Sequence, residues 1–158
     1  MDPLNRLEHD HQHLNRIVES LRLSIAAALR GERDQNDVLD DFDEFIRLVN
    51  EELFAHFERE ESVLFPWVVE QLPDTQERIS SMEVAHDRIC GAASRMEYLL
   101  AQGRPAADAG FDTLVALFAR FDANFLKHAD DERAFIDSLI QRLSPDQQTV
   151  VATMLEEI

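Results

Sequence analysis

Apolar residues recur along the chain at alternating steps of three and four, the spacing of one buried face of a helix. Asp2 followed by Pro3 favours a helix start, and Gly31 favours the end of the same helix. No segment shows the period-two alternation that is typical of a β-strand. The inward stripe of this first helix is Leu4, Leu7, Leu14, Val18, Leu21, Ile25 and Ala28.

Three further stripes of the same period follow. We expect a second helix from about Asn36 into LFPWVVEQL, where Pro66 should kink or end it. A third helix follows the turn LPDT, and a fourth follows the loop AQGRPAADAG. The expected inward residues are Val49, Leu53, Val63 and Trp67 in the second helix, Ile79, Met82, Ile89, Ala93, Met96 and Leu100 in the third, and Phe111, Leu114, Phe118, Phe121, Phe125, Phe135 and Leu139 in the fourth.

These elements predict an all-α, up-down-up-down four-helix bundle with a short C-terminal fifth helix. Ser144, Pro145 and Gln147 form the capping-box pattern that opens the fifth helix. The 158 residues suit a single domain, with the bundle over about 3–142 and the last helix over about 145–158.

Histidine and glutamate interrupt all four stripes at matching places. The interrupting residues are His11 in the first helix, His56 and Glu60 in the second, His86 in the third, and His128 and Glu132 in the fourth. Counting residues along each hairpin puts the four histidines within roughly 2 to 5 Å of one level, at 1.5 Å per residue. The segments LFAHFEREESVLF and FLKHADDERAFID also align as an internal repeat, with H-x-x-x-E in each.

The histidine triplet near the start of the chain has only one inward member. His9 and His13 each lie roughly 160° around the helix from His11. The leucine stripe selects His11, so we expect His9 and His13 on the solvated surface.

Four imidazoles and two carboxylates at one level of an apolar core need partners, because an unpaired buried carboxylate costs several kcal/mol. Spacing of i, i+4 places each H-x-x-x-E pair on one helical face, where both side chains reach the same ion. The two repeats therefore predict a site for two metal ions. Buried His–Glu ion pairs in a metal-free bundle are the structural alternative.

The net charge and the cysteine content limit the classes of partner and the cellular compartment that we expect. With 32 acidic and 15 basic residues, the formal charge of −17 disfavours nucleic acid and anionic membranes as partners. The single Cys90 cannot form an internal disulfide, and no apolar run suits a signal peptide or a membrane span. We therefore expect a cytoplasmic protein.

At these residues the chain resembles the hemerythrin-like family of HHE cation-binding domains, from His11 to Glu132, with HFEREESVLFP the most specific segment. The resemblance implies a non-haem di-iron centre, bridged by an oxide or hydroxide, with His11, His56, His86 and His128 as terminal ligands. Glu60 and Glu132 would be the bridging carboxylates. Nitrogen and carboxylate ligands also suit manganese or zinc.

The chain departs from the oxygen-carrying members of that family. Cys90 stands where those proteins have a further histidine, and Arg133 stands where they have the last carboxylate, here supplied by Glu132. Two octahedral irons offer twelve positions, of which the four histidines, two bridging glutamates and the bridging oxygen fill ten. One open position on each iron favours reaction with small ligands over reversible O₂ carriage. Cys90 is either a further ligand or a small core residue.

Several functions fit this site. The first is binding or turnover of O₂, peroxide or nitric oxide, including catalase- or peroxidase-like activity with a separate redox donor. The second is an iron- or oxygen-sensing or iron-handling module that acts through a protein partner. The third is a ferritin-like site built on Glu8 with His11 and on Glu83 with His86, which leaves His56 and His128 unexplained. The fourth function is protein interaction by a metal-free bundle.

Overall fold

The computed structural model describes the backbone of residues 3–157 and the side chains of residues 12–156. Every regular element in this part of the chain is helical, which confirms the all-α prediction. None of the described helices is long and apolar enough to cross a membrane. The elements are α1 (Pro3–Leu29), α2 (Gln35–Leu48), the π-helical turn η1 (Val49–Leu53), α3 (Phe54–Arg59), the π-helical turn η2 (Glu60–Leu64), α4 (Phe65–Gln71), the 3₁₀ turn η3 (Pro73–Thr75), α5 (Gln76–Ala101), α6 (Arg104–Ala109), α7 (Phe111–Arg142) and α8 (Pro145–Glu157).

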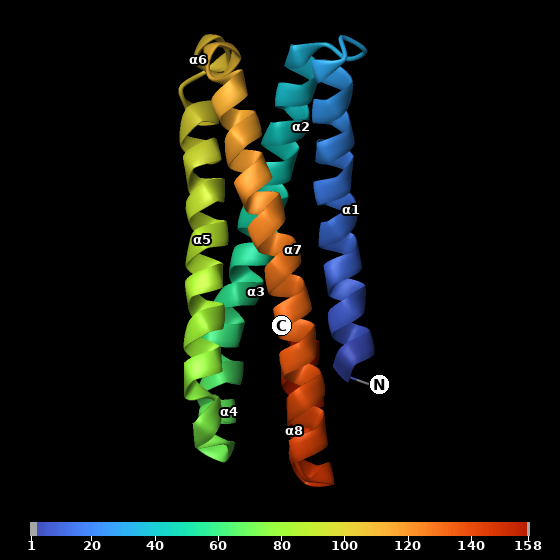
Figure 1. The fold of residues 1–158 in the computed structure, drawn as a ribbon, viewed down its shortest axis with the longest axis vertical. Helices are drawn as coiled ribbons and strands as arrows, with labels where there is room; N and C mark the ends of the chain where they lie inside the picture. The colour runs from blue at the N-terminus through green and yellow to red at the C-terminus, as the bar shows by residue number, and fades with distance from the viewer. Residues whose placement is uncertain (1–2, 158) are drawn as a thin grey trace.

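Long helical segments run side by side along the long axis of the molecule (Figure 1). They are α1, the continuous run from α2 to α4, α5 and α7. Helix α5 packs along α7, and α1 packs along α2. Helix α8 turns back after α7 and packs against α1 and η2, so it covers the end of the molecule opposite α6.

Local sequence signals account for the helix ends. Gly31, with φ of +73°, follows the end of α1 in a left-handed conformation that suits glycine. The predicted capping box of α8 is confirmed, because the Ser144 backbone N–H donates to Gln147 Oε1 at 2.9 Å and the Gln147 N–H donates to Ser144 Oγ at 3.2 Å. The predicted cap at Asp2 lies outside the described residues.

The structure corrects one expected helix boundary and decides part of another. The segment predicted as the loop AQGRPAADAG contains the short helix α6, which begins after Gly103. Of the two alternatives predicted at Pro66, a kink or a helix end, the end is excluded, because the second helix continues through α4 to Gln71. Pro66 stands at the start of α4, directly after the π turn η2, where the Phe65 N–H bonds to the carbonyl oxygen of Glu60, five residues back. The altered hydrogen-bond pattern accommodates a residue that lacks an N–H.

The π turn also changes which side chains face inward. Val63 was predicted to be buried, yet it is 45% exposed, and Leu64 is buried in its place. A π turn takes more residues per turn than an α-helix, so the inward face moves one position along the chain. Beyond η2, Val68 is buried and Trp67 is only partly buried.

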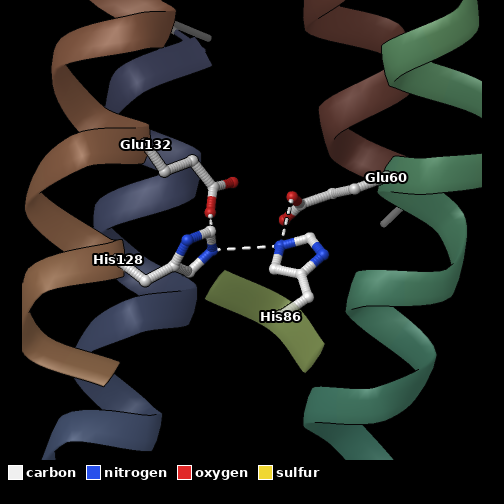
Figure 2. A group of neighbouring side chains, drawn as sticks. All are labelled: Glu60, His86, His128 and Glu132. Carbon is white, nitrogen blue, oxygen red and sulfur yellow. Dashed lines mark hydrogen bonds and ion pairs between the residues drawn. The ribbon is translucent and has the colours of Figure 1, made fainter. Parts of the chain in front are cut away.

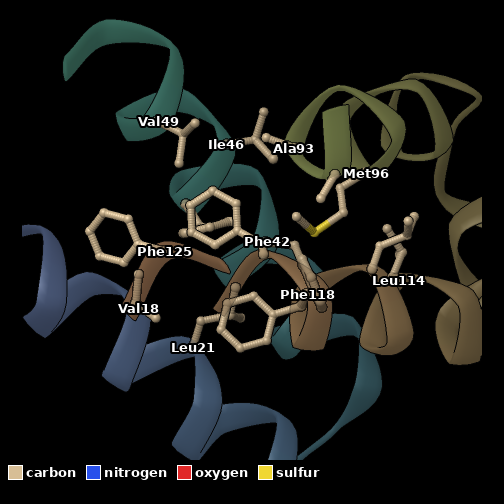
Figure 3. Packing of buried hydrophobic residues seen from close by; sticks show 14 of the residues in the cluster. Val18, Leu21, Phe42, Ile46, Val49, Ala93, Met96, Leu114, Phe118 and Phe125 are labelled. Carbon is tan, nitrogen blue, oxygen red and sulfur yellow. The ribbon is translucent and has the colours of Figure 1, made fainter. Parts of the chain in front are cut away.

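Apolar side chains form two clusters. The larger one, which we call the α6-end cluster, is built around edge-to-face phenylalanine pairs such as Phe42 with Phe118, whose ring centroids are 6.2 Å apart (Figure 3). The other, which we call the α8 cluster, contains Leu64, Phe135 and, from α8, Val151 and Leu155. The predicted stripe of the fourth helix is confirmed, since all seven of its apolar members are buried.

Truncation of a phenylalanine in the α6-end cluster should be strongly destabilising. We expect Phe121→Ala to lower the free energy of unfolding by about 3–5 kcal/mol, because Phe121 is 1% exposed and its loss leaves a cavity. Tyr98, which is 68% exposed, provides the control, and Tyr98→Ala should change stability by less than about 0.5 kcal/mol. Urea denaturation of both variants measures the difference; similar costs would contradict the assigned core.

Candidate metal centre

Five of the predicted side chains meet between the two apolar clusters. His56 comes from α3, Glu60 is the first residue of η2, His86 comes from α5, and His128 and Glu132 come from α7. All five are buried, and His56 is the most accessible of them at 8%. Figure 2 shows Glu60, His86, His128 and Glu132 converging from three helical segments.

The two halves of the cluster meet at a pair of imidazoles. The Nε2 atoms of His86 and His128 are 3.1 Å apart. His128 Nε2 is also 3.0 Å from Glu132 Oε2, and His86 Nε2 is 3.4 Å from Glu60 Oε2. One donor atom from each of these four residues lies within 4.8 Å of the others, a spacing that allows a shared ion.

Each carboxylate faces histidines on two different helices. Glu60 directs Oε1 to His56 Nε2 and Oε2 to His86 Nε2. Glu132 directs Oε2 to His128 Nε2, while its Oε1 is 3.9 Å from His56 Nε2. His56 therefore stands on one side of the two carboxylates, and His86 and His128 stand together on the other side.

Burial and mutual interaction shift the acid–base properties of the cluster. Burial and the nearby Glu132 charge raise the pKa of Glu60 to about 8. Burial lowers the pKa of His56, but Glu60 and Glu132 outweigh that effect and raise it to about 10. Burial and the neighbouring His128 lower the pKa of His86 to about 4, so its imidazole is neutral at pH 7. In the metal-free cluster, protons on His56 and Glu60 compensate charge that a bound cation would otherwise balance.

Glu132 and His128 complete the cluster as an ion pair. Burial opposes ionisation of Glu132, but the imidazoles of His128 and His56 outweigh that effect and hold its pKa well below the usual range. Burial likewise opposes a charged His128, and its hydrogen bond to Glu132 outweighs that effect, so the pKa of His128 is raised. The pKa shifts of both members of the α7 pair therefore favour their charged forms.

The other histidines and glutamates considered from the sequence are not among the five converging side chains. His11 lies in α1, but its side chain and that of His9 are outside the described residues. His13 is 55% exposed and pairs with Glu52 at the surface, which confirms the prediction for that residue. Glu83, needed for a ferritin-like site, is half-buried and does not belong to the group of converging ligands that the described residues form.

Cys90 stands apart from the converging ligands. Its side chain is partly buried and packs against the α6-end cluster. Burial and the nearby Asp87 and Glu61 carboxylates raise the pKa of its thiol to about 11. Cys90 does not belong to the group of converging ligands that the described residues form, and its contacts are those of a small packing residue.

Sequence reasoning missed the side chains that hold His86. The Phe57 ring stacks on the His86 ring, with centroids 3.8 Å apart and an angle of 12° between planes. Phe65 lies at 5.9 Å and 18°, and Glu61 Oε1 is 3.2 Å from His86 Nδ1. The signal was present in the sequence, because Phe57, Glu61 and Phe65 follow each other at steps of four residues.

The donor set and its surroundings fit a metal ion. None of the described residues gives either carboxylate oxygen of Glu60 a well-aligned hydrogen bond, although Glu60 is fully buried. Two nitrogens at right angles on one ion, each about 2.1 Å away, lie about 3 Å apart, close to the observed His86–His128 separation. Imidazole nitrogens with carboxylate oxygens suit iron, manganese or zinc.

Comparison with known families agrees with this chemistry. A family model described as the hemerythrin HHE cation binding domain matches residues 2–135. No curated protein and no solved structure matches the chain.

Replacement of a buried histidine should abolish metal binding where replacement of a surface histidine does not. We expect His128→Ala to lose bound metal, because two of the converging carboxylate and imidazole groups contact its Nε2. His13→Ala, the matched control, should keep the wild-type metal content. Elemental analysis after iron loading measures both, and equal retention would refute the assignment. The same measurement on His11→Ala tests the sixth predicted ligand.

Proposed function

Because the chain belongs to the hemerythrin HHE cation-binding domain family, we propose that its buried cluster holds a non-haem di-iron centre that binds or reacts with O₂, peroxide or nitric oxide. The helical segments would then form an up-down-up-down bundle around that centre. The observation that carries the proposal is the placement of Glu60 and Glu132, each of which reaches histidines on two helices.

That placement suggests how the ligands divide between two ions. His86 and His128 would serve one ion, and His56, together with His11 from α1, would serve the other. Glu60 and Glu132 would bridge the two, because each has one oxygen on either side. Neutral imidazoles supply the nitrogen lone pairs, and the carboxylates balance the cation charge in an apolar core.

Phenyl rings line part of the site. Phe57 stacks on the His86 ring and meets the His128 ring edge-on at 5.4 Å, and the Phe65 ring lies nearly parallel to His86 at 5.9 Å. An apolar lining admits small uncharged molecules such as O₂, nitric oxide and peroxide more readily than ions. Bound iron would supply redox chemistry and open coordination positions for these ligands.

Side chains near the site favour reaction over simple carriage. Cys90, one turn beyond His86, has no imidazole nitrogen to offer, so a coordination position beside His86 would stay open to small ligands. Tyr98 is 68% exposed, which disfavours a tyrosyl radical on this residue as a part of the chemistry at the buried site. The formal charge of −17 disfavours nucleic acid and membrane surfaces as partners, and the lone cysteine suits the cytoplasm.

Removal of the metal should lower the melting temperature. The metal-free cluster keeps two carboxylates and three imidazoles facing one another, and ligand binding at 100 times Kd contributes about 2.7 kcal/mol to folding stability. For a chain of this size that corresponds to roughly 5–10 °C. Calorimetry of iron-loaded and chelator-treated protein, with about two irons per loaded chain, tests this. An unchanged melting temperature after verified metal removal would favour a metal-free bundle.

Iron(II)-loaded protein should consume peroxide or O₂, and Cys90→His should slow that consumption. The added imidazole would occupy the free position one turn beyond His86, provided that the ring fits where the thiol packs. An oxygen electrode and a peroxide assay, with His13→Ala as control, measure the rates. Reversible O₂ binding over many cycles without consumption would refute the reaction and favour a carrier or sensor.

A further inference from the structure

His86 is surrounded by three residues from one helical run. Phe57 from α3 stacks on its ring at 3.8 Å, the Phe65 ring from α4 lies nearly parallel to it at 5.9 Å, and Glu61 from η2 contacts its Nδ1 edge. These three residues follow one another at steps of four residues and lie along one side of the run. The opposite edge of the ring, which carries Nε2, faces Glu60 and His128.

The contact with Glu61 decides which ring nitrogen carries the proton. A glutamate carboxylate accepts hydrogen bonds and cannot donate them, so the Nδ1 atom 3.2 Å from Glu61 Oε1 must be the donor. In a neutral imidazole the other nitrogen then has a free lone pair. For His86 that lone pair is on Nε2, which lies 3.1 Å from His128 Nε2.

Without Glu61 the opposite tautomer would compete. A proton on His86 Nε2 would point into the cluster, and it would block the lone pair that a metal ion needs. The stacked phenyl rings fix the plane of the imidazole, but they do not distinguish its two nitrogens. Polar groups at the two edges of the ring can do that. Glu60 and His128 face Nε2, and Glu61 is the described residue that contacts Nδ1.

We propose that Glu61 is a positioning residue that orients His86 and holds it in the tautomer with Nε2 free for metal. This inference rests on the proposed function, since it assumes that His86 is a ligand. Glu61 itself is 39% exposed, so its side chain lies at the edge of the site and reaches the buried imidazole from the solvent side. Its neighbour in sequence, Glu60, is fully buried and faces the cluster. Adjacent glutamates thus act on opposite edges of one imidazole.

Variants of Glu61 separate its hydrogen bond from its charge. Glu61→Ala removes the acceptor, whereas Glu61→Gln keeps a carbonyl oxygen that can accept from Nδ1. Glu58→Gln, at an exposed glutamate on α3, is the matched control for the loss of one negative charge. Because Glu61 is partly exposed and the two phenylalanines remain, all three variants should fold.

Two measurements test the proposal. Iron(II) affinity, measured anaerobically against a competing chelator, should fall about 10–100-fold in Glu61→Ala and stay near wild type in Glu61→Gln and Glu58→Gln. In metal-free protein, two-bond ¹H–¹⁵N correlation spectra should show His86 protonated on Nδ1 in the wild type and in Glu61→Gln, and a mixture of tautomers in Glu61→Ala.

Either a wild-type tautomer pattern or a wild-type iron affinity in Glu61→Ala would overturn the positioning role. An equal fall of iron(II) affinity in Glu58→Gln would also overturn it, since the removal of any nearby negative charge would then explain the weaker binding. A wild-type protein that binds no iron would refute the proposed function instead, and the spectra of metal-free protein would still decide whether Glu61 orients His86.

Discussion

The structure depends on the burial of two carboxylates in the middle of an apolar core. Glu60 and Glu132 are at most 1% exposed, and an ionised group in that position costs several kcal/mol unless it is compensated. The nearest partner of each carboxylate is a histidine four residues earlier in the same run, His56 for Glu60 and His128 for Glu132. Each carboxylate also faces a histidine from another helix, which requires the helices to be aligned at this level. The α6-end cluster and the α8 cluster lie on either side and supply the packing that keeps the level closed.

The π turn η2 lies where the buried side of one helical run changes from the ligand cluster to the α8 cluster. Glu60 must face the cluster, and the apolar residues that follow must face the α8 cluster. Across the turn Glu60 and Leu64 are both buried, and Glu61 lies next to the edge of His86. Helical π turns are rare and recur at functional sites, and here the turn begins at a proposed ligand.

Much of this arrangement was predictable from the sequence, because period and residue type carry it. The spacing of histidines between apolar residues on each helix predicted one common level for them. His86 and His128 do meet there, and His56 faces the same two carboxylates. The burial of Leu64 in place of Val63 could not be predicted, since the period of an ideal α-helix does not reveal a π turn. Nor does a periodic pattern show ring stacking, which depends on how two helices face each other across the core, as Phe57 and His86 do.

The step of four residues that links Phe57, Glu61 and Phe65 has a consequence for how this protein can change over evolution. Exposed positions of the run between them, such as Glu58 and Ser62, can vary freely in side chain without disturbing what surrounds His86. Insertion or deletion of a single residue between Phe57 and Phe65 would rotate one phenylalanine away from the ring by roughly 100°. Related chains should therefore tolerate length variation in the turn after Gly31 and keep the distance from Phe57 to Phe65 constant.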